Sequence, residues 1–519
     1  MYAAFAIAAA LGLAVFIIWW LTAGGRRASA PAAANPAPLA QPPSPEARIE
    51  VSLPRGGSLA GSTDDAGRAA ARLTGATLVR LNRATDELEP GLAESWTVSS
   101  DNLLYTVKLR AGLAWPDGRP FTAADAVAAI GSALVVGKPV ALTARDAQTI
   151  DVRFPQPFAP GLRVFAARPL AGTGPFLAPE KNVFARNPRY WRKAGDGSPL
   201  PYLDSIAIVS GRPGEHDFAD MAVRAEDVEA LRTLEAAGKI RLFDLGPALD
   251  ADALWFRPAR DEAGLDIPWL FDERFRLAIS TAVDRREYCK QVFYGACDPI
   301  GGPVTTANIS WFNPDLPIGR PDAALARAML GEMGLRDRTG DGILDDAALR
   351  PVRFALLIRT DATHAARAAT FLANTLRTIG VDITVTPLSA SALAARRQKG
   401  SYDAIYDRIE MADTDPAMNL DFWLSSGASH PWNPARTAPP SDWERQIDRL
   451  MLKNASSFDR IERLQSFVDA QKIYAQHMPA IFFGAPYIRI VTSMRTLNAT
   501  PSILRPHLLW NAEALAALK

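Results

Sequence analysis

The segment from Asp337 to Asp345 is the first stretch whose residue types could bind an ion. It runs Asp-Arg-Thr-Gly-Asp-Gly-Ile-Leu-Asp, which places oxygen-bearing side chains at positions 1, 3, 5 and 9 of a calcium loop and a glycine at position 6. The twelfth position is Ala348, so the bidentate carboxylate on which such loops depend is missing. We therefore predict a polar hairpin here, with calcium binding as the alternative.

Residues that could support catalysis or hold a transition metal do not cluster in the sequence. No pair of histidines has the His-x-x-x-His spacing with which a helix binds zinc. A Gly-Lys-Ser/Thr phosphate loop is also missing, which excludes the ATP-hydrolysing subunit of a transporter. We predict that the protein is not an enzyme and uses neither a cofactor nor a metal. The five histidines are His216, His364, His430, His477 and His507.

Only two cysteines occur, Cys289 and Cys297, and they are close in sequence. Gly295 between them would help the chain to turn back. In an oxidising compartment the pair could form a disulfide, whereas in the cytosol both would remain thiols. The compartment therefore decides between these two states.

The length and charge of the chain limit the domain organisation that positions these residues and the partners that the protein can bind. A chain of 519 residues predicts two or three domains rather than one core. The 57 Lys and Arg residues nearly equal the 56 Asp and Glu residues, which leaves a net charge of +1. This balance argues against nucleic acid as a main partner.

The amino-terminal residues predict an attachment to the membrane. Residues 2–23 carry no charge and could cross a bilayer as a helix, with Trp19 and Trp20 at the interface. A Pro/Ala-rich tether follows at 28–47. We favour an uncleaved anchor within 1–27, because a signal peptide usually has a shorter apolar region; cleavage of a signal segment remains the alternative.

Residues 78–130 predict a small folding unit made of a two-stranded ribbon, a tight turn and a helix. Tyr105 to Leu109 alternate between apolar and polar, as in a half-buried strand that pairs with Ser95–Val98. Trp115 to Gly118 should reverse the chain. Thr122 and Asp125 then form an acidic variant of the capping box at the start of a helix.

The carboxyl-terminal half alternates predicted strands and helices, which is typical of an α/β unit. The pattern between Val352 and Ile405 is strand, helix, strand, helix, strand. Two late helices should be followed by two separate strands, at Ile481–Phe483 and Ile488–Val491.

Three sets of residues together resemble the family 5 extracellular solute-binding proteins, the peptide- and nickel-binding receptors of ABC importers. The most specific set is the longest, and the resemblance covers nearly everything after residue 48. Most of the glycine, proline and aromatic residues in the second set are interpreted as turns and core edges. The sets are Pro90 to Val127 (with Leu-Ala-Glu-Ser-Trp, Trp-Pro-Asp-Gly and Pro-Phe-Thr-Ala), Gly172 to Ile206 (with Gly-Thr-Gly-Pro-Phe, Arg-Asn-Pro-Arg-Tyr-Trp and Pro-Tyr-Leu-Asp) and Phe271 to Arg285.

The resemblance also implies where a ligand binds. Peptide-binding members hold the ligand's α-ammonium with an aspartate in an Ala-Asp-Tyr-x-x-Pro-like segment, which here corresponds to Asp413. The match is incomplete, because Thr414 replaces the aromatic residue, and Asp415 could take this role instead. A solvated acidic turn is the alternative. Trp423 and Trp432 are candidate wall residues of the site, or else core residues.

The fold implied by the resemblance is α/β and periplasmic-binding-protein type II-like: two lobes with a hinge, plus an extra domain inserted in lobe one. The hinge would lie near Asp261–Ile267 and Pro479. The domain boundaries that we expect are 48–80, 165–265 and 480–519 for lobe one, 81–164 for the inserted domain and 266–479 for lobe two.

The implied function is an extracytoplasmic, membrane-anchored receptor that binds short peptides or a related small solute in a cleft between the two lobes and passes them to an ABC permease and its ATPase. We expect a monomer that closes about its hinge. Two alternatives remain open: a nickel-chelate or oligosaccharide receptor, and a membrane-tethered sensor or interaction protein on the same fold.

Overall fold

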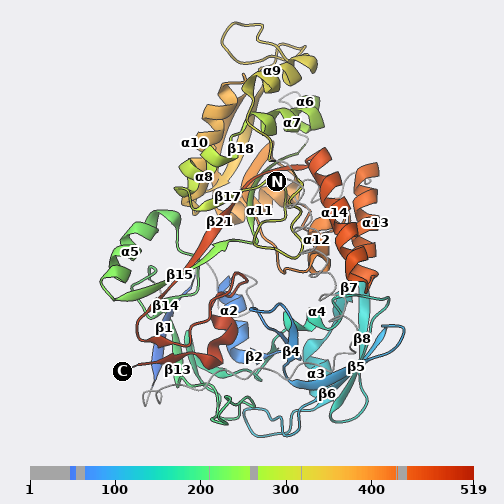
Figure 1. The fold of residues 1–519 in the computed structure, drawn as a ribbon, viewed down its shortest axis with the longest axis vertical. Helices are drawn as coiled ribbons and strands as arrows, with labels where there is room; N and C mark the ends of the chain where they lie inside the picture. Colours follow the sequence, from blue (N-terminus) through green and yellow to red (C-terminus); the bar gives the residue numbers. More distant parts are fainter. Residues whose placement is uncertain are drawn as a thin grey trace, which may run out of the picture.

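The computed structural model describes residues 47–53, 65–209, 211–257, 267–316, 318–427, 429–430 and 441–518. The fold is α/β, with one large sheet through the molecule and a smaller sheet beside its lower half (Figure 1). None of the helices in these ranges is long and apolar enough to cross a membrane. The predicted anchor at 1–27 and nearly all of the tether lie outside the described residues.

The large sheet has twelve strands in the order β11-β12-β13-β1-β14-β21-β16-β20-β18-β19, with β15 and β17 also paired to β21. Its strands are β1 (Arg48–Ser52), β11 (Phe176–Glu180), β12 (Val183–Arg186), β13 (Ser205–Val209), β14 (Phe218–Ala219), β15 (Ile240–Pro247), β16 (Ala251–Phe256), β17 (Cys297–Pro299), β18 (Arg353–Arg359), β19 (Asp382–Leu388), β20 (Ala404–Ile409) and β21 (Ala480–Ser493).

Strand β21 joins the two halves of this sheet and crosses the middle of the molecule (Figure 1). It pairs with β16 around Phe482 and with β15 around Ile490. The prediction of two separate strands here is wrong, because the chain stays extended through Gly484–Pro486. These residues pair with β17, so the missing N–H of Pro486 does not end the strand.

A disulfide joins Cys289 of α8 (Arg285–Phe293) to Cys297 of β17. It lies against Gly484 of β21. A side chain at position 484 would come within 2.3 Å of the Cys297 sulfur, so glycine allows this close approach.

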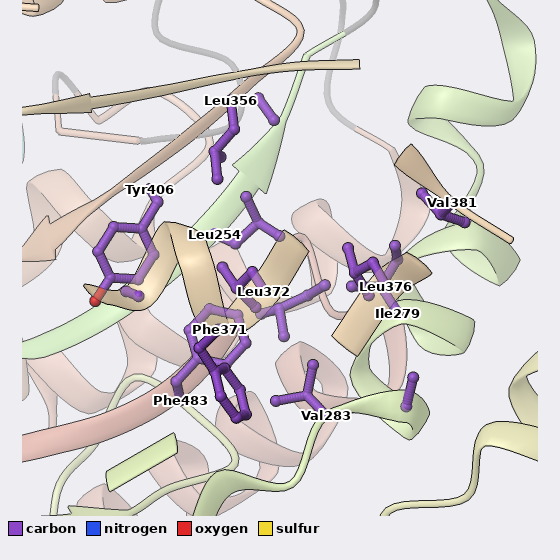
Figure 2. Packing of buried hydrophobic residues seen from close by; sticks show 14 of the residues in the cluster. Leu254, Ile279, Val283, Leu356, Phe371, Leu372, Leu376, Val381, Tyr406 and Phe483 are labelled. Carbon is purple, nitrogen blue, oxygen red and sulfur yellow. The ribbon is translucent and has the colours of Figure 1, made fainter. Parts of the chain in front are cut away.

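Helices cover both faces of the half-sheet formed by β16, β18, β19 and β20. Because neighbouring strand residues point to opposite faces, Leu254 and Phe483 enter one core and Trp255 and Phe482 enter the other. Figure 2 shows the first core, where Leu254 lies near Leu372. The helices of this half are α6 (Pro268–Phe271), α7 (Glu273–Ala282), α8, α9 (Ala323–Glu332), α10 (Thr363–Arg377), α11 (Ala390–Lys399), α12 (Leu420–Trp423), α13 (Asp442–Ser456) and α14 (Arg460–His477), with the 3-10 helix η2 (Pro416–Asn419).

The other half-sheet has its own core, to which β1, α2, β21 and the carboxyl-terminal segment contribute. Ile49 of β1, Leu73 of α2 and Ile490 of β21 are fully buried in it. Its helices are α2 (Asp65–Thr74), α5 (Val228–Ala236) and the 3-10 helices η1 (Ala225–Asp227) and η3 (Leu509–Ala514).

The smaller sheet is antiparallel, in the order β5-β6-β9-β8-β7, and confirms the local predictions for 78–130. Thr97 pairs with Thr106 across the expected hairpin. Thr122 and Asp125 form the expected capping box. The unit consists of β5 (Ala93–Val98), β6 (Leu104–Leu109), β7 (Ala133–Val135), β8 (Lys138–Ala144), β9 (Thr149–Arg153), α3 (Ala123–Ile130) and α4 (Arg163–Ala166).

The small-sheet unit also contacts α13 in the other half of the molecule. The backbone N–H of Ala159 donates to the carbonyl of Ala455 at 2.7 Å, and Ala455 lies in the same core as the small sheet. The remaining described strands pair in short two-stranded ribbons: β2 (Gly75–Ala76) with β10 (Leu170–Ala171), β3 (Val79–Leu81) with β4 (Leu88–Pro90), and β22 (Thr496–Leu497) with β23 (Ala516–Ala517).

Candidate ligand-binding site

A cavity of about 480 Å³ lies where the parts of the molecule meet. Both half-sheets, the small-sheet unit and the carboxyl-terminal segment contribute to its wall. This volume falls within the usual range of small-molecule sites. Residues of the wall include Arg68, Ala71, Arg72, Gly75, Arg80, Arg83, Arg163, Ala167, Tyr190, Trp191, Leu249, Asp250, Glu410, Met411, Asp413, Leu504, Arg505, Pro506, Trp510 and Glu513.

Helix α2 supplies one side of the cavity because it is amphipathic. Ala69 and Leu73 are fully buried in the core beneath it. Arg68 and Arg72, four residues apart and so on one face, line the cavity together with Gly75 just after the helix. The same packing that fixes α2 therefore directs two guanidinium groups towards the site.

The cationic side chains of the described cavity wall are all arginines, and six arginines line the cavity together with four carboxylates. Arg163 of α4 forms the central ion pair. Its Nε donates to Oδ1 of Asp413 at 2.9 Å, and its Nη2 lies 2.6 Å from Oδ1 of Asp86. Burial would lower the pKa of Arg163, but Asp413 and Asp86 outweigh burial and raise it. This pair connects the small-sheet unit to the segment after β20.

Glu513 of η3 is buried between two arginines. It pairs with Arg80 of β3, and Nη1 of Arg192 lies 2.6 Å from its Oε1. Burial would raise the pKa of the Glu513 carboxyl, but the two arginines outweigh burial and hold its pKa below the usual range. The carboxylate therefore stays ionised and neutralises part of the charge of the wall.

Arg505 closes the carboxyl-terminal side of the cavity. It pairs with Asp250, and its Nη1 lies 3.1 Å from Oε2 of Glu410. Asp250 also accepts a hydrogen bond from the backbone N–H of Met411 at 3.0 Å. The carboxyl-terminal segment is thus tied to the residue just before β16 and to the residues just after β20.

The structure places Asp413 on the cavity, with 13% of its side chain exposed. Its Oδ1 accepts bonds from Arg163, Thr414 and the backbone N–H of Asp415. No described residue donates to its Oδ2. Burial raises the pKa of the Asp413 carboxyl above its usual range, although Arg163 acts in the opposite direction.

Asp415 lies close by but away from the cavity wall. Its carboxylate caps η2 through the backbone N–H of Ala417 at 2.9 Å. The same Oδ1 lies 2.6 Å from Nη2 of Arg463 in α14. Asp415 thus holds η2 against α14.

Trp423 is 3% exposed and packs edge-to-face against Phe467 and Tyr474 in the core. It borders a void of about 20 Å³ that Asp413 also borders, rather than the main cavity. Trp432 lies outside the described residues.

Sequence reasoning did not identify Tyr190 and Trp191 as cavity residues; it interpreted them as a core edge. Tyr190 does pack in a small core, yet both rings reach the cavity wall. The guanidinium of Arg110 lies 4.4 Å from the Trp191 ring centroid, which is a cation–π contact. The Arg68/Arg72 spacing on an amphipathic helix was the one signal that could have located this wall.

The acidic turn at 337–345 is held together by its own backbone. Asp337 accepts hydrogen bonds from the N–H groups of Gly340 and Gly342, and Asp345 accepts one from Arg338. No group of three or more His, Cys, Asp or Glu side chains that could hold a metal occurs in the described part of the chain.

Comparison with known proteins agrees with this architecture. The model of the bacterial extracellular solute-binding proteins, family 5, matches residues 87–431. A probable ABC transporter-binding protein of Deinococcus radiodurans is 23% identical over 499 residues, which cover 82% of this chain and 84% of the relative.

Solved structures share the fold. The oligopeptide-binding protein AppA of Bacillus subtilis, in complex with a nonapeptide, superposes with a TM-score of 0.73 at 18% identity, covering 92% of this chain and 100% of AppA. The periplasmic binding protein MelB of Agrobacterium fabrum, in complex with stachyose, gives 0.71 at 20% identity and covers 91% and 85%. With its family signatures, its two half-sheets joined by β21 and its enclosed cavity, the chain belongs to family 5 of the bacterial extracellular solute-binding proteins.

Proposed function

We propose that the protein is the substrate-binding receptor of an ABC importer and that it captures a short peptide or a related small solute in the cavity. The observation that carries this proposal is the construction of the wall. Residues such as Arg72, Arg163 and Glu410 come from different parts of the molecule and enclose one space. A solute bound there would contact all of these parts and favour their closed arrangement.

We further propose that closure takes place where the chain crosses between the half-sheets. One crossing is β21. We place the other at 247–251, between β15 and β16, instead of near Asp261–Ile267 as the sequence suggested, because β16 pairs with β20 and packs Leu254 against α7 and α10. Residues 261–266 lie outside the described part of the chain. The boundaries expected for the inserted domain, 81–164, enclose β5 to β9.

Asp413 is the residue that we propose to hold a ligand's ammonium group. Arg163 occupies only Oδ1 of this carboxylate, so Oδ2 can accept an N–H from a ligand in the cavity. Trp191 would provide an apolar surface for side chains of different shapes. Asp415, which is bound to Arg463, would act by holding η2 in place.

Calorimetry with defined ligands tests this function. Tripeptides with a free amino terminus should bind, and their N-acetylated forms should bind more weakly because the acetyl group removes the ammonium charge. If stachyose or nickel–histidine binds while no peptide does, the receptor function holds and the peptide assignment is overturned. If none of these solutes binds, the receptor function is contradicted.

An oligosaccharide is the second candidate ligand. The aromatic rings of Tyr190, Trp191 and Trp510 all reach the cavity wall, and such faces pack well against sugar rings. Stachyose is the probe for this candidate in the same calorimetric series.

We also propose that residues 1–27 anchor a monomeric receptor at the outer face of the cytoplasmic membrane. The uncharged run at 2–23 supports this. In the native host, the full chain should stay in the membrane fraction after a carbonate wash. A soluble protein that starts after residue 27 would instead establish cleavage, and a sensor-kinase gene beside this one would favour the sensor alternative.

A further inference from the structure

Arg72 faces the cavity without a carboxylate partner among the described residues. Its Nη2 donates to the carbonyl oxygen of Ala166 at 2.6 Å. Burial, and then the nearby Arg80, lower the pKa of Arg72 to about 10, against the weaker attraction of Glu513. A carbonyl oxygen accepts a hydrogen bond but carries no net charge, so the positive charge of Arg72 remains.

Arg83 has the same kind of environment. Its Nη1 donates to the carbonyl oxygens of Leu504 and Pro506, both at 2.6 Å, and its Nη2 donates to that of Arg505 at 3.1 Å. Its guanidinium lies 5.4 Å from the ring centroid of Trp510. These contacts fix the group at the cavity wall without neutralising it.

The two groups also repel each other. Burial, and then Arg72, lower the pKa of Arg83, which falls to about 9; the attraction of Asp220 and Asp413 does not compensate. Like charges that are held together in an enclosed space destabilise the empty protein. The bonds to carbonyl oxygens hold both groups in place, but they do not remove this repulsion, whereas an anionic ligand would.

The other ion pairs of the wall leave these charges unmatched. The six arginines exceed the four carboxylates by two within the described wall, which is the number of guanidinium groups bound only to carbonyls. Four pairs are already made: Arg163 with Asp413, Arg80 with Glu513, Arg505 with Asp250, and Arg68 with Glu410 at 4.0 Å.

We propose that the solute carries a net negative charge and that its carboxylate or phosphate oxygens bind Arg72 and Arg83. This inference rests on the proposed receptor function. Guanidinium groups suit such oxygens because they donate two parallel N–H bonds to one oxyanion. An ammonium on the same solute can bind Asp413, provided that the anionic groups outnumber it.

Calorimetry with isosteric pairs tests the proposal. The peptide Ala-Glu-Glu is compared with Ala-Gln-Gln, and trehalose 6-phosphate with trehalose, each on the full chain at up to millimolar concentration. At least one anionic member should have a dissociation constant at least tenfold lower than that of its neutral counterpart. A difference of about this size is expected from a charge-assisted hydrogen bond. The two pairs separate a carboxylate source from a phosphate source.

Variants connect the effect to the residues. Arg72→Gln should weaken binding of the anionic member about tenfold and leave the neutral member unchanged. The matched control is Arg274→Gln, an exposed arginine outside the cavity. The melting temperature of the ligand-free Arg72→Gln protein should stay the same or rise, because removing a repulsive charge offsets the loss of the single bond to Ala166. Arg83→Gln is less suitable, because it loses three bonds to 504–506.

Several outcomes overturn the proposal. Equal affinities within both pairs do so, as does unchanged affinity of Arg72→Gln for the anionic member. If Ala-Gln-Gln binds as tightly as Ala-Glu-Glu and trehalose binds as tightly as trehalose 6-phosphate, the receptor function survives and only the charge assignment fails. If no solute of either kind binds, both fail.

Discussion

Two buried polar clusters of this protein differ in whether their charges balance. One is centred on Asp252 in β16, which is fully buried. Its carboxylate accepts from Tyr406 at 2.8 Å, from Tyr288 at 3.1 Å and from Nε of Arg408 at 2.8 Å, and His364 lies 3.8 Å away. Burial opposes ionisation, but Arg408 and then His364 outweigh it and lower the pKa of Asp252.

The other cluster is the cavity wall, where Arg72 and Arg83 bond to carbonyl oxygens and keep their charges. The Asp252 carboxylate already has a charged partner and hydrogen-bond donors, as is expected of a polar network that holds a core together. The cavity wall is incomplete without an added anion. Charge balance therefore distinguishes a structural cluster from a binding site more clearly than burial does.

The largest effect should come from Asp252→Asn. The substitution leaves Arg408 without its carboxylate in a buried network, which should cost about 3–5 kcal/mol of the free energy of unfolding. Urea denaturation measures this, with Asp272→Asn at an exposed ion pair as control. A loss below about 1 kcal/mol would mean that the cluster is not structural.

A pH effect should come next. Burial lowers the pKa of His364 from 6.5 to about 4, and the attraction of Asp252 offsets this only in part. The unfolded chain thus binds this proton at a higher pH than the folded chain. Stability should fall as the pH drops from 6.5 towards 4, by up to about 3 kcal/mol.

Denaturation midpoints measured between pH 7 and pH 4 check this pH effect. His364→Gln should show a shallower loss than the unmutated protein, whereas His216→Gln, at a half-buried histidine beside Glu50, serves as the matched control. Identical pH profiles for the His364→Gln and unmutated proteins would contradict the assignment.

The smallest expected effects are those of substitutions at Asp413 and Asp415, and they distinguish the roles of these two aspartates. Asp415→Ala removes the cap of η2 and the partner of Arg463, so it should cost about 1–2 kcal/mol of stability with little change in affinity. Asp413→Asn should do the reverse and weaken binding of amino-terminally free peptides about tenfold.

The pH dependence of peptide affinity sharpens this contrast. Because burial raises the pKa of Asp413 above 3.8, its carboxylate is protonated earlier as the pH falls. Affinity should therefore decline on acidification in the unmutated protein and in Asp415→Ala, but stay flat in Asp413→Asn. Calorimetry at several pH values decides, and a flat profile in all three would remove Asp413 from the site.

The sequence predicted local features well. The hairpin around Tyr105 and the cap at Thr122 depend on neighbouring residues, so their patterns are visible in the chain. The continuity of β21 was missed because a Gly-Ala-Pro stretch usually marks a turn, and only its pairing with β17 keeps it extended.

The cavity was predicted only at Asp413. Its arginines are spread from Arg68 to Arg505, and each has an ordinary local context. Nothing in a single sequence shows that Arg72 faces a carbonyl oxygen while Arg163 faces a carboxylate. Charge balance is a property of the assembled wall, so it required the fold.

Native mass spectrometry of the receptor purified from its own host without denaturation tests the central claim most directly. The account predicts one retained small solute with a net negative charge, which is present in Arg274→Gln and depleted in Arg72→Gln. A neutral or cationic solute that is retained equally by both variants would contradict it.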